Sequence, residues 1–286
     1  MSSGRYIDAH CHLADPRLDS GRDALIAECE KRGIGAFIQG GVDPEDWERQ
    51  LELVRRYPGR VFPCFGIHPW VSGATPSDSG RLERALDELP KYLQRGVGLG
   101  ETGLDHGRKM DPAGFARQEQ VFKHQLEIVR SRPLPLILHI VHAHAEALAI
   151  LEELGPFPRG GLVHSFGGSR EIADRYLKLG FTISVGGSVT RKGFETLKRA
   201  VVGLPLDRIV IESDSPDQIP EGFEGWTCDA ATGTGASSLN DPRSLWTVAE
   251  AIGSLRRDGI SAAGLLDRSR ENLIRIFGLE SETGTI

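Results

Sequence analysis

The stretch FARQEQVFKHQLEIVRSRPLPLILH (residues 115–139) contains the two kinds of segment from which the whole chain is built. Its first part carries apolar side chains at helical spacing, among them Phe122, Leu126 and Val129, which predicts an amphipathic helix. Its second part is a short apolar run that ends at His139 and is typical of a buried strand. A helix followed by such a strand is the repeating unit of a parallel sheet.

Seven other apolar runs of the same kind occur along the chain. The eight predicted strands are Tyr6–His10, Ala36–Gly40, Val61–Gly66, Val97–Gly100, Pro135–His139, Gly161–Ser165, Phe181–Val185 and Arg208–Glu212. Their starts lie about 29 residues apart on average, which matches a (β/α)₈ barrel. An open, doubly wound sheet is the alternative, but no GxGxxG motif follows the first strand. We therefore expect one α/β barrel domain that spans residues 1–286.

The composition is typical of a globular protein, because 39% of the 286 residues are hydrophobic and 26% are charged. No apolar run approaches the roughly 20 residues that span a bilayer, and the N-terminus lacks an apolar signal core. We therefore expect a cytoplasmic protein without a membrane partner. The formal net charge of −6 excludes a global basic surface, so any nucleic acid must be held locally. The four cysteines form no CxxC pair, which disfavours a zinc ribbon.

Three segments depart from the repeating pattern. Residues 1–4 and 280–286 are predicted to be disordered tails. Residues 216–242 are rich in Gly, Ser, Thr and Asp without periodicity, which is typical of a lid, a binding loop or disorder. Because this segment follows the eighth strand, we expect it to lie over the mouth of the barrel. Within it, Trp226 either stacks on a base or pins the loop onto the barrel.

Metal-ligand residue types gather at the carboxyl ends of the predicted strands. The alternation of the first strand places His10 and His12 on the same side. Four further residues close or follow other strands: Glu101, His139, His164 and Asp214. Imidazoles and carboxylates at apolar strand ends are costly to bury unless they are paired or bind a cation. These six residues therefore predict a metal site at the mouth of the barrel.

The donor set indicates the chemistry of this site. Four neutral imidazoles with carboxylates suit Zn²⁺ or Mn²⁺ better than an all-oxygen calcium site does. Two ions that share Glu101 as a bridge would use all six residues, and such a pair activates water for hydrolysis. We assign Asp214 as the general base that orients and deprotonates this water, with a role as ligand only as the alternative.

The motifs of the chain, in their order, resemble those of TatD-type metal-dependent hydrolases of the amidohydrolase superfamily. They are DAHCHL (8–13), FGIHP (65–69), GLGETGLD (98–105), ILH (137–139), VHSFGGS (163–169), GGSVT (186–190), PLDRIVIESDSP (205–216) and LNDP (239–242). The resemblance runs from about Ile7 to Gly278. It implies a (β/α)₈ enzyme with two divalent ions, which we expect to be zinc, manganese or magnesium.

The resemblance also implies how the six residues are shared between the ions. The first ion would be held by His10, His12, Glu101 and Asp214, and the second by Glu101, His139 and His164. Members of the family are associated with hydrolysis of DNA phosphodiesters, often as 3′ to 5′ exonucleases. Some relatives are associated with removal of D-amino acids from charged tRNA.

One motif departs from the family. Many members carry Ser-Arg-Asp-Ala after the fifth-strand histidine, whereas this chain has Val141 at the Arg and His142 at the Asp. An Arg is a good bidentate phosphate clamp, so its absence weakens the phosphodiesterase assignment. Basic residues that could replace it follow the fourth and seventh strands, namely Arg108, Lys109, Arg191 and Lys192.

Three other residues have two interpretations each. His68, in GIHP, matches a family residue near the substrate, with a structural loop histidine as the alternative. His142 either touches substrate or packs at the start of a helix. Asn240, in LNDP, either lies near the substrate or caps the following helix, because Asn is a good N-cap.

The sequence leaves three alternative functions. The first is a metal-dependent hydrolase of phosphodiesters, with DNA as the expected substrate, in which Asp214 and Glu101 are catalytic. The second keeps the metal chemistry but cleaves an ester or amide, such as a D-aminoacyl-tRNA or a small metabolite. The third is a non-catalytic interaction protein with an idle metal site, and the complete ligand set argues against it.

Overall fold

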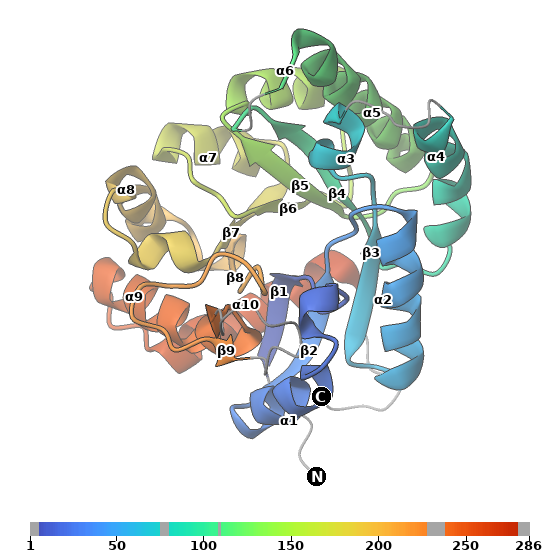
Figure 1. Ribbon diagram of the computed structural model, residues 1–286. Coiled ribbons are helices and arrows are strands. Elements are labelled where there is room, and N and C mark those ends of the chain that lie inside the picture. Colours follow the sequence, from blue (N-terminus) through green and yellow to red (C-terminus); the bar gives the residue numbers. More distant parts are fainter. Residues whose placement is uncertain (1–5, 75–79, 108–109, 228–237, 280–286) are drawn as a thin grey trace.

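The computed structural model describes residues 6–74, 80–107, 110–227 and 238–279. Eight parallel strands form one sheet in the order of the chain, from β1 to β8 (Figure 1). They are β1 (Tyr6–Cys11), β2 (Ile34–Gln39), β3 (Val61–Phe65), β4 (Gly98–Asp105), β5 (Leu136–Val141), β6 (Gly161–His164), β7 (Phe181–Val185) and β8 (Ile209–Ile211). At the seam, Asp214 N donates to His10 O at 3.0 Å and His12 N donates to Ser215 O at 2.7 Å. The predicted (β/α)₈ barrel is confirmed.

Helices surround the sheet on its outer side (Figure 1). They are α1 (Arg22–Lys31), α2 (Pro44–Arg56), α3 (Pro69–Gly73), α4 (Arg81–Tyr92), α5 (Pro112–Ser131), α6 (His144–Leu154), α7 (Arg170–Lys178), α8 (Glu195–Gly203), α9 (Leu245–Arg256) and α10 (Ala262–Phe277). Short 3₁₀ turns are η1 (Pro16–Leu18), η2 (Gly187–Thr190), η3 (Leu206–Arg208) and η4 (Pro242–Ser244). No helix in the described ranges is long and apolar enough to cross a membrane.

Local sequence explains where several helices begin. Asp43 accepts a hydrogen bond from Asp46 N at 3.0 Å, and Asp111 accepts one from Gly114 N at 2.6 Å. A proline follows each of these caps, at the helix position that tolerates it best. Within LNDP, however, the residue that caps the following helical turn, η4, is Asp241 and not Asn240, since the Asp241 side chain accepts a hydrogen bond from Arg243 N at 2.9 Å. The interpretation of Asn240 as a helix cap is wrong.

The hydrophobic core consists of two buried clusters, one on each surface of the sheet. Apolar residues from several strands, including Ile7, Ile38, Ile137 and Leu162, meet in one buried cluster with the end of α10. The outer surfaces of the strands pack against the helices in a second, larger cluster. Because both surfaces of the sheet are buried, its strands are almost uniformly apolar, and polar side chains collect where the strands end.

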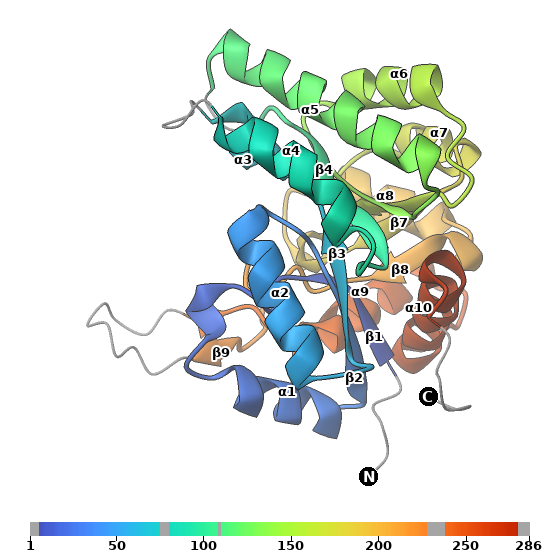
Figure 2. The same ribbon diagram turned by 90° about the vertical axis from the view of Figure 1, so that its right-hand side faces the viewer.

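The segment after β8 contains more regular structure than its composition predicts. Its strands β9 (Trp226–Thr227) and β10 (Ser238–Leu239) pair in antiparallel fashion. Strand β9 lies beside α1 (Figure 2). Trp226 lies against Gly21, just before α1, and the Arg243 guanidinium is 5.5 Å from its ring centroid. These contacts pin the described part of the segment onto the barrel. Residues 228–237 and the two predicted tails lie outside the described residues.

Candidate metal centre

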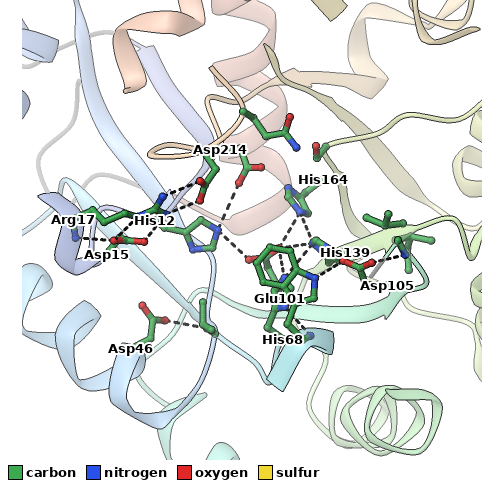
Figure 3. Close-up of a pocket in the computed structure, with 18 of the residues that line it drawn as sticks. His12, Asp15, Arg17, Asp46, His68, Glu101, Asp105, His139, His164 and Asp214 are labelled. Carbon is green, nitrogen blue, oxygen red and sulfur yellow. Dashed lines mark hydrogen bonds and ion pairs between the residues drawn. The ribbon is translucent and has the colours of Figure 1, made fainter. Parts of the chain in front are cut away.

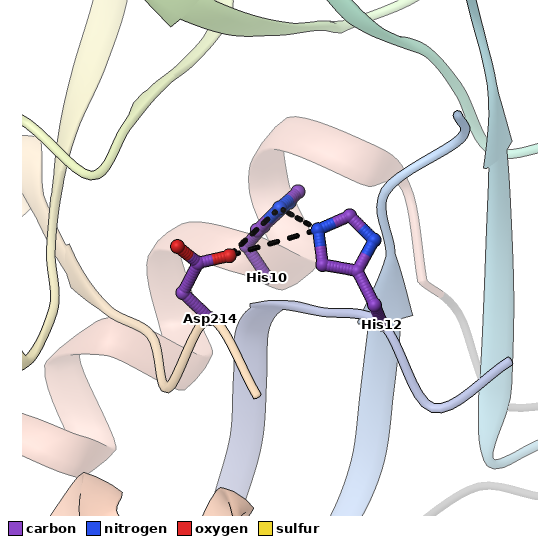
Figure 4. A group of neighbouring side chains, drawn as sticks. All are labelled: His10, His12 and Asp214. Atoms are coloured by element: carbon purple, nitrogen blue, oxygen red, sulfur yellow. Dashed lines mark hydrogen bonds and ion pairs between the residues drawn. The ribbon is translucent and has the colours of Figure 1, made fainter. Parts of the chain in front are cut away.

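The six predicted metal ligands come together near the carboxyl ends of the strands. Figure 3 labels five of them, and Figure 4 adds His10. His10 and Glu101 are in β1 and β4, His139 and His164 are in β5 and β6, and His12 and Asp214 follow β1 and β8. The parallel register places His139 directly beside His164. All are buried except His12, which is partly exposed.

One donor group surrounds the end of β1 (Figure 4). The Nε2 atoms of His10 and His12 are 3.3 Å apart, and Asp214 Oδ1 is 3.6 Å from each. Glu101 Oε1 completes the group, at 3.5 Å from His10 Nε2 and 3.1 Å from His12 Nε2. Four ligands at about 2.1 Å around a tetrahedral zinc ion lie about 3.4 Å from one another. The spacing of these donors therefore fits a divalent ion.

A second donor group uses the other oxygen of the same carboxylate. Glu101 Oε2 is 3.1 Å from His139 Nδ1 and 2.9 Å from His164 Nε2, and these two nitrogens are 3.0 Å apart. His68 Nε2 also belongs here, at 3.3 Å from His139 Nδ1 and 3.7 Å from Glu101 Oε2. The sequence placed His68 near the substrate, whereas the structure makes it a further donor of this group.

Glu101 is the residue that joins the two groups. Its carboxylate is almost fully buried, and its Oε1 atom forms no well-directed hydrogen bond among the described residues, although His12 Nε2 lies 3.1 Å away. A buried carboxylate oxygen is costly unless a hydrogen-bond donor or a cation satisfies it. Together with the nitrogen and oxygen donors on both sides, this oxygen fits a metal centre. The donor chemistry suits a borderline ion such as zinc or manganese.

The charges of the cluster are strongly coupled. Burial would raise the pKa of Glu101, but the surrounding rings, His164 foremost, hold it well below its ordinary value. Burial opposes a charge on His12 and His164, yet Glu101 raises the pKa of both well above the ordinary value. Both shifts favour the protonated form of these rings in the absence of an ion. Because only neutral imidazole coordinates a metal, binding of an ion is coupled to loss of protons from these rings.

Asp105 orients one of the candidate ligands and was not predicted. Its Oδ2 is 3.1 Å from Nε2 of His139, whose other ring nitrogen faces Glu101. It also accepts hydrogen bonds from Trp70 Nε1 and, at 2.8 Å, from Gly107 N. A carboxylate on the far side of a ligating histidine fixes the ring and its tautomer. The signal was available, because Asp105 and Glu101 share one face of β4 at an even spacing.

Two further buried carboxylates hold the ends of neighbouring strands. Asp8 accepts hydrogen bonds from Ser213 Oγ at 2.5 Å, Ser213 N at 3.0 Å and His10 N at 3.3 Å. Burial raises the pKa of Asp8 to about 8, partly offset by the bonds from Ser213. Glu212 accepts from Ser165 N at 2.5 Å and lies 3.6 Å from His164 Nδ1. These contacts fix the backbone that carries His10, His164 and Asp214.

The donor groups open into a cavity of about 550 Å³ (Figure 3). Asp15, Asp46 and Asp217 line it in addition to the carboxylates described above. The one Lys or Arg among the described lining residues is Arg17, which forms two-point hydrogen bonds with both Asp15 and Asp217. Before any ion is bound, this mouth is therefore acidic.

The predicted substrate residues other than His68 do not line this cavity. His142 is exposed, with a φ of 52°, and precedes α6. Arg191 donates to Gln218 Oε1 at 3.2 Å and to Ile219 O at 2.7 Å, so its guanidinium holds the segment after β8. Lys192 is exposed, and Arg108 and Lys109 lie outside the described residues. Asn240 is buried and donates to Ser213 O, behind the site.

Comparison with known proteins gives matches along nearly the whole chain. Residues 7–278 match the family model described as TatD related DNase. The uncharacterized metal-dependent hydrolase YjjV of Escherichia coli K12 is 32% identical over 222 residues, which cover 77% of this chain and 83% of that protein. Human deoxyribonuclease TATDN3 is 28% identical over 278 residues, covering 95% and 94%. The crystal structure of E. coli YjjV has a TM-score of 0.83 at 27% identity, covering 97% of this chain and 99% of that one.

Proposed function

Because the chain belongs to the TatD related DNase family of metal-dependent hydrolases, we propose that it hydrolyses phosphodiester bonds of DNA, with release of nucleotides from 3′ ends. One observation carries the catalytic part of this proposal. The two oxygens of Glu101 face two separate groups of donors, an arrangement suited to two ions side by side. The relative named deoxyribonuclease TATDN3 supports the choice of DNA.

The proposed ligands divide at Glu101. His10, His12 and Asp214 would hold one divalent ion together with Oε1 of Glu101, and His139 and His164 would hold another together with Oε2. His68 is close enough to join the second set. When bound, such ions lower the pKa of a water molecule and stabilise negative charge on the attacking and leaving oxygens. We propose zinc, manganese or magnesium in these positions.

We assign the proton-accepting role to Asp214. Burial would raise the pKa of this carboxyl, but its hydrogen bond with His12 and the charges of the neighbouring rings keep it below the ordinary value. It is therefore ionised at neutral pH and able to take a proton. Its backbone N–H donates to His10 O, which fixes the carboxylate beside the donors of β1. Glu101 contributes by holding both donor groups in register.

Hydrolysis of a smaller ester or amide is the second candidate. One observation favours it, namely the acidic lining of the mouth, where Arg17 is already bound to Asp15 and Asp217. A polyanion would meet little positive charge there until the ions are bound. A small metabolite with an ester or amide bond would not have this difficulty, whereas the tRNA of a D-aminoacyl-tRNA would share it.

The test is release of nucleotides from 3′-labelled single-stranded DNA by protein loaded with Mn²⁺ or Mg²⁺. Chelation by EDTA and the Asp214→Asn variant serve as controls, since each removes one required element. The proposal is supported if the metal-loaded protein releases nucleotides and both controls abolish this release. No release from protein that binds its ions contradicts it and favours the ester or amide substrate.

A further inference from the structure

Part of the cavity lining is apolar. Trp70 of α3 lines the cavity and is 42% exposed, and only one other large hydrophobic side chain in the described ranges, Val202, is comparably exposed. Ile140 and Val141, at the end of β5, line the cavity as well. An exposed aromatic ring that lines a cavity beside the proposed ligands is unlike a scattered surface hydrophobe, because it is placed where a bound molecule would meet it.

The Trp70 ring is held in place before any ligand arrives. Its Nε1 donates to Asp105, and its backbone N–H donates to His68 Nδ1 at 3.0 Å. Its ring centroid is 4.8 Å from that of His68 and 6.0 Å from that of His139. A fixed ring loses little conformational entropy when a ligand stacks on it. Trp70 is thus a rigid platform next to two rings of the second donor group.

Val141 is a second apolar neighbour of Asp105. In the register of β4 and β5, Val141 pairs with Asp105, the residue that binds the indole. Gly107 brings the backbone close at this point, since a Cβ there would come within 2.8 Å of Val141 Cγ1. Trp70, Val141 and Gly107 are therefore all neighbours of Asp105, and all three line the cavity.

We propose that Trp70 and Val141 form a stacking subsite for a planar ring of the substrate, the nucleobase of the nucleotide whose phosphodiester bond is cleaved. The inference rests on the proposed function and specifies how the substrate is held. Aromatic side chains bind bases of any sequence by stacking, without help from positive charge. In an acidic mouth with a single described arginine, ring stacking supplies the local hold on DNA that phosphate clamps do not.

The test compares a probe that has a nucleobase with one that lacks it, 2′-deoxyadenosine 5′-monophosphate and 2-deoxyribose 5-phosphate, in which a hydroxyl takes the place of adenine. Binding of each to the Mn²⁺-loaded protein is measured by titration calorimetry. We expect the wild type to bind the nucleotide about tenfold more tightly than the sugar phosphate. Trp70→Ala should lose most of this preference, because it removes the ring. Trp70→Phe should keep most of it, because Phe still stacks; since Phe cannot bond to Asp105, this variant separates stacking from that hydrogen bond.

Trp246→Phe is the matched control. Trp246 of α9 packs edge-on against Tyr6 and bonds to Arg32 O, away from the cavity, so the preference should be unchanged. Equal affinity of the wild type for both probes would overturn the subsite, as would a Trp70→Phe variant that behaves like Trp70→Ala. If DNA is cleaved but the ring preference is absent, only the subsite is wrong. If the preference is present but DNA is not cleaved, only the phosphodiester assignment is wrong.

Discussion

Asp105 and His139 form a pair in which the carboxylate fixes the ring that faces Glu101. The contact of 3.1 Å is made by Nε2, which leaves Nδ1 directed at the second donor group. The partners of Asp105 reach from β5 to α3, so one carboxylate orients both a proposed ligand and the exposed Trp70 ring. In the proposed site, binding of the second ion and stacking of a substrate ring on Trp70 would therefore be linked through Asp105.

Replacing Asp105 by Asn should weaken metal binding. The amide retains the shape of the carboxylate but withdraws its charge from His139, so we expect a 10- to 100-fold loss of affinity for one of the ions. Competition with a chromogenic chelator measures it. Asp207→Asn, an exposed position in η3, is the control and should match the wild type. An unchanged affinity in Asp105→Asn would mean that the contact does not support the centre.

Asp214→Asn separates catalysis from metal binding. Loss of the proposed proton acceptor should reduce kcat by about 10²- to 10⁴-fold, while metal content falls less than it does in Glu101→Gln. Turnover on the preferred substrate and metal content are measured on the same preparation. Wild-type turnover in Asp214→Asn would remove this residue from the mechanism.

Arg17 links the loop after β1 to the segment after β8, because it binds Asp15 and Asp217, which are 202 residues apart in the chain. Since all three side chains are partly exposed, Arg17→Ala should lower the free energy of unfolding by only about 0.5 kcal/mol. Hydrogen exchange of the amides around Asp217 should nevertheless become faster. Unchanged exchange would show that Arg191, through Gln218 and Ile219, holds this segment by itself.

Asp46 should make stability depend on pH. Burial raises its pKa from 3.8 to about 6, although Gln50 and Val42 N donate to it. The pKa of this carboxyl is higher in the folded than in the unfolded state. Its contribution to stability is therefore fully present below about pH 4 and is lost as the pH rises to about 6. Because the side chain keeps some contact with water, we expect Asp46→Asn to be more stable by about 1 kcal/mol at pH 7. The two proteins should converge near pH 4 in urea denaturation; a variant that is less stable at pH 7 would contradict this.

The fold could be predicted closely because buried parallel strands leave a strong signal. The run Phe181–Val185 coincides with β7, and the other predicted strands overlap their counterparts. The largest difference in length is at β4, which was predicted to end at Gly100. The strand continues to Asp105 through ETGLD, where small and polar residues interrupt the apolar run. Glu101 therefore lies within β4 and not at its end.

Some features of the site depend on contacts that no single segment reveals. His68 caps α3 with one ring nitrogen and joins the donor cluster with the other, which the GIHP motif alone cannot show. Arg191 follows β7 as expected, but its side chain turns to the backbone of Ile219. Such outcomes depend on which partner lies nearest in space.

The proposed bridging of two ions by Glu101 is tested most directly by metal stoichiometry. The wild type and Glu101→Gln are freed of metal, reloaded with Mn²⁺, passed through a desalting column and analysed by mass spectrometry of the metal. We predict two ions per chain for the wild type and at most one for Glu101→Gln, with an unchanged circular dichroism spectrum. One ion per chain in the wild type, or two retained in Glu101→Gln, would contradict the bridge.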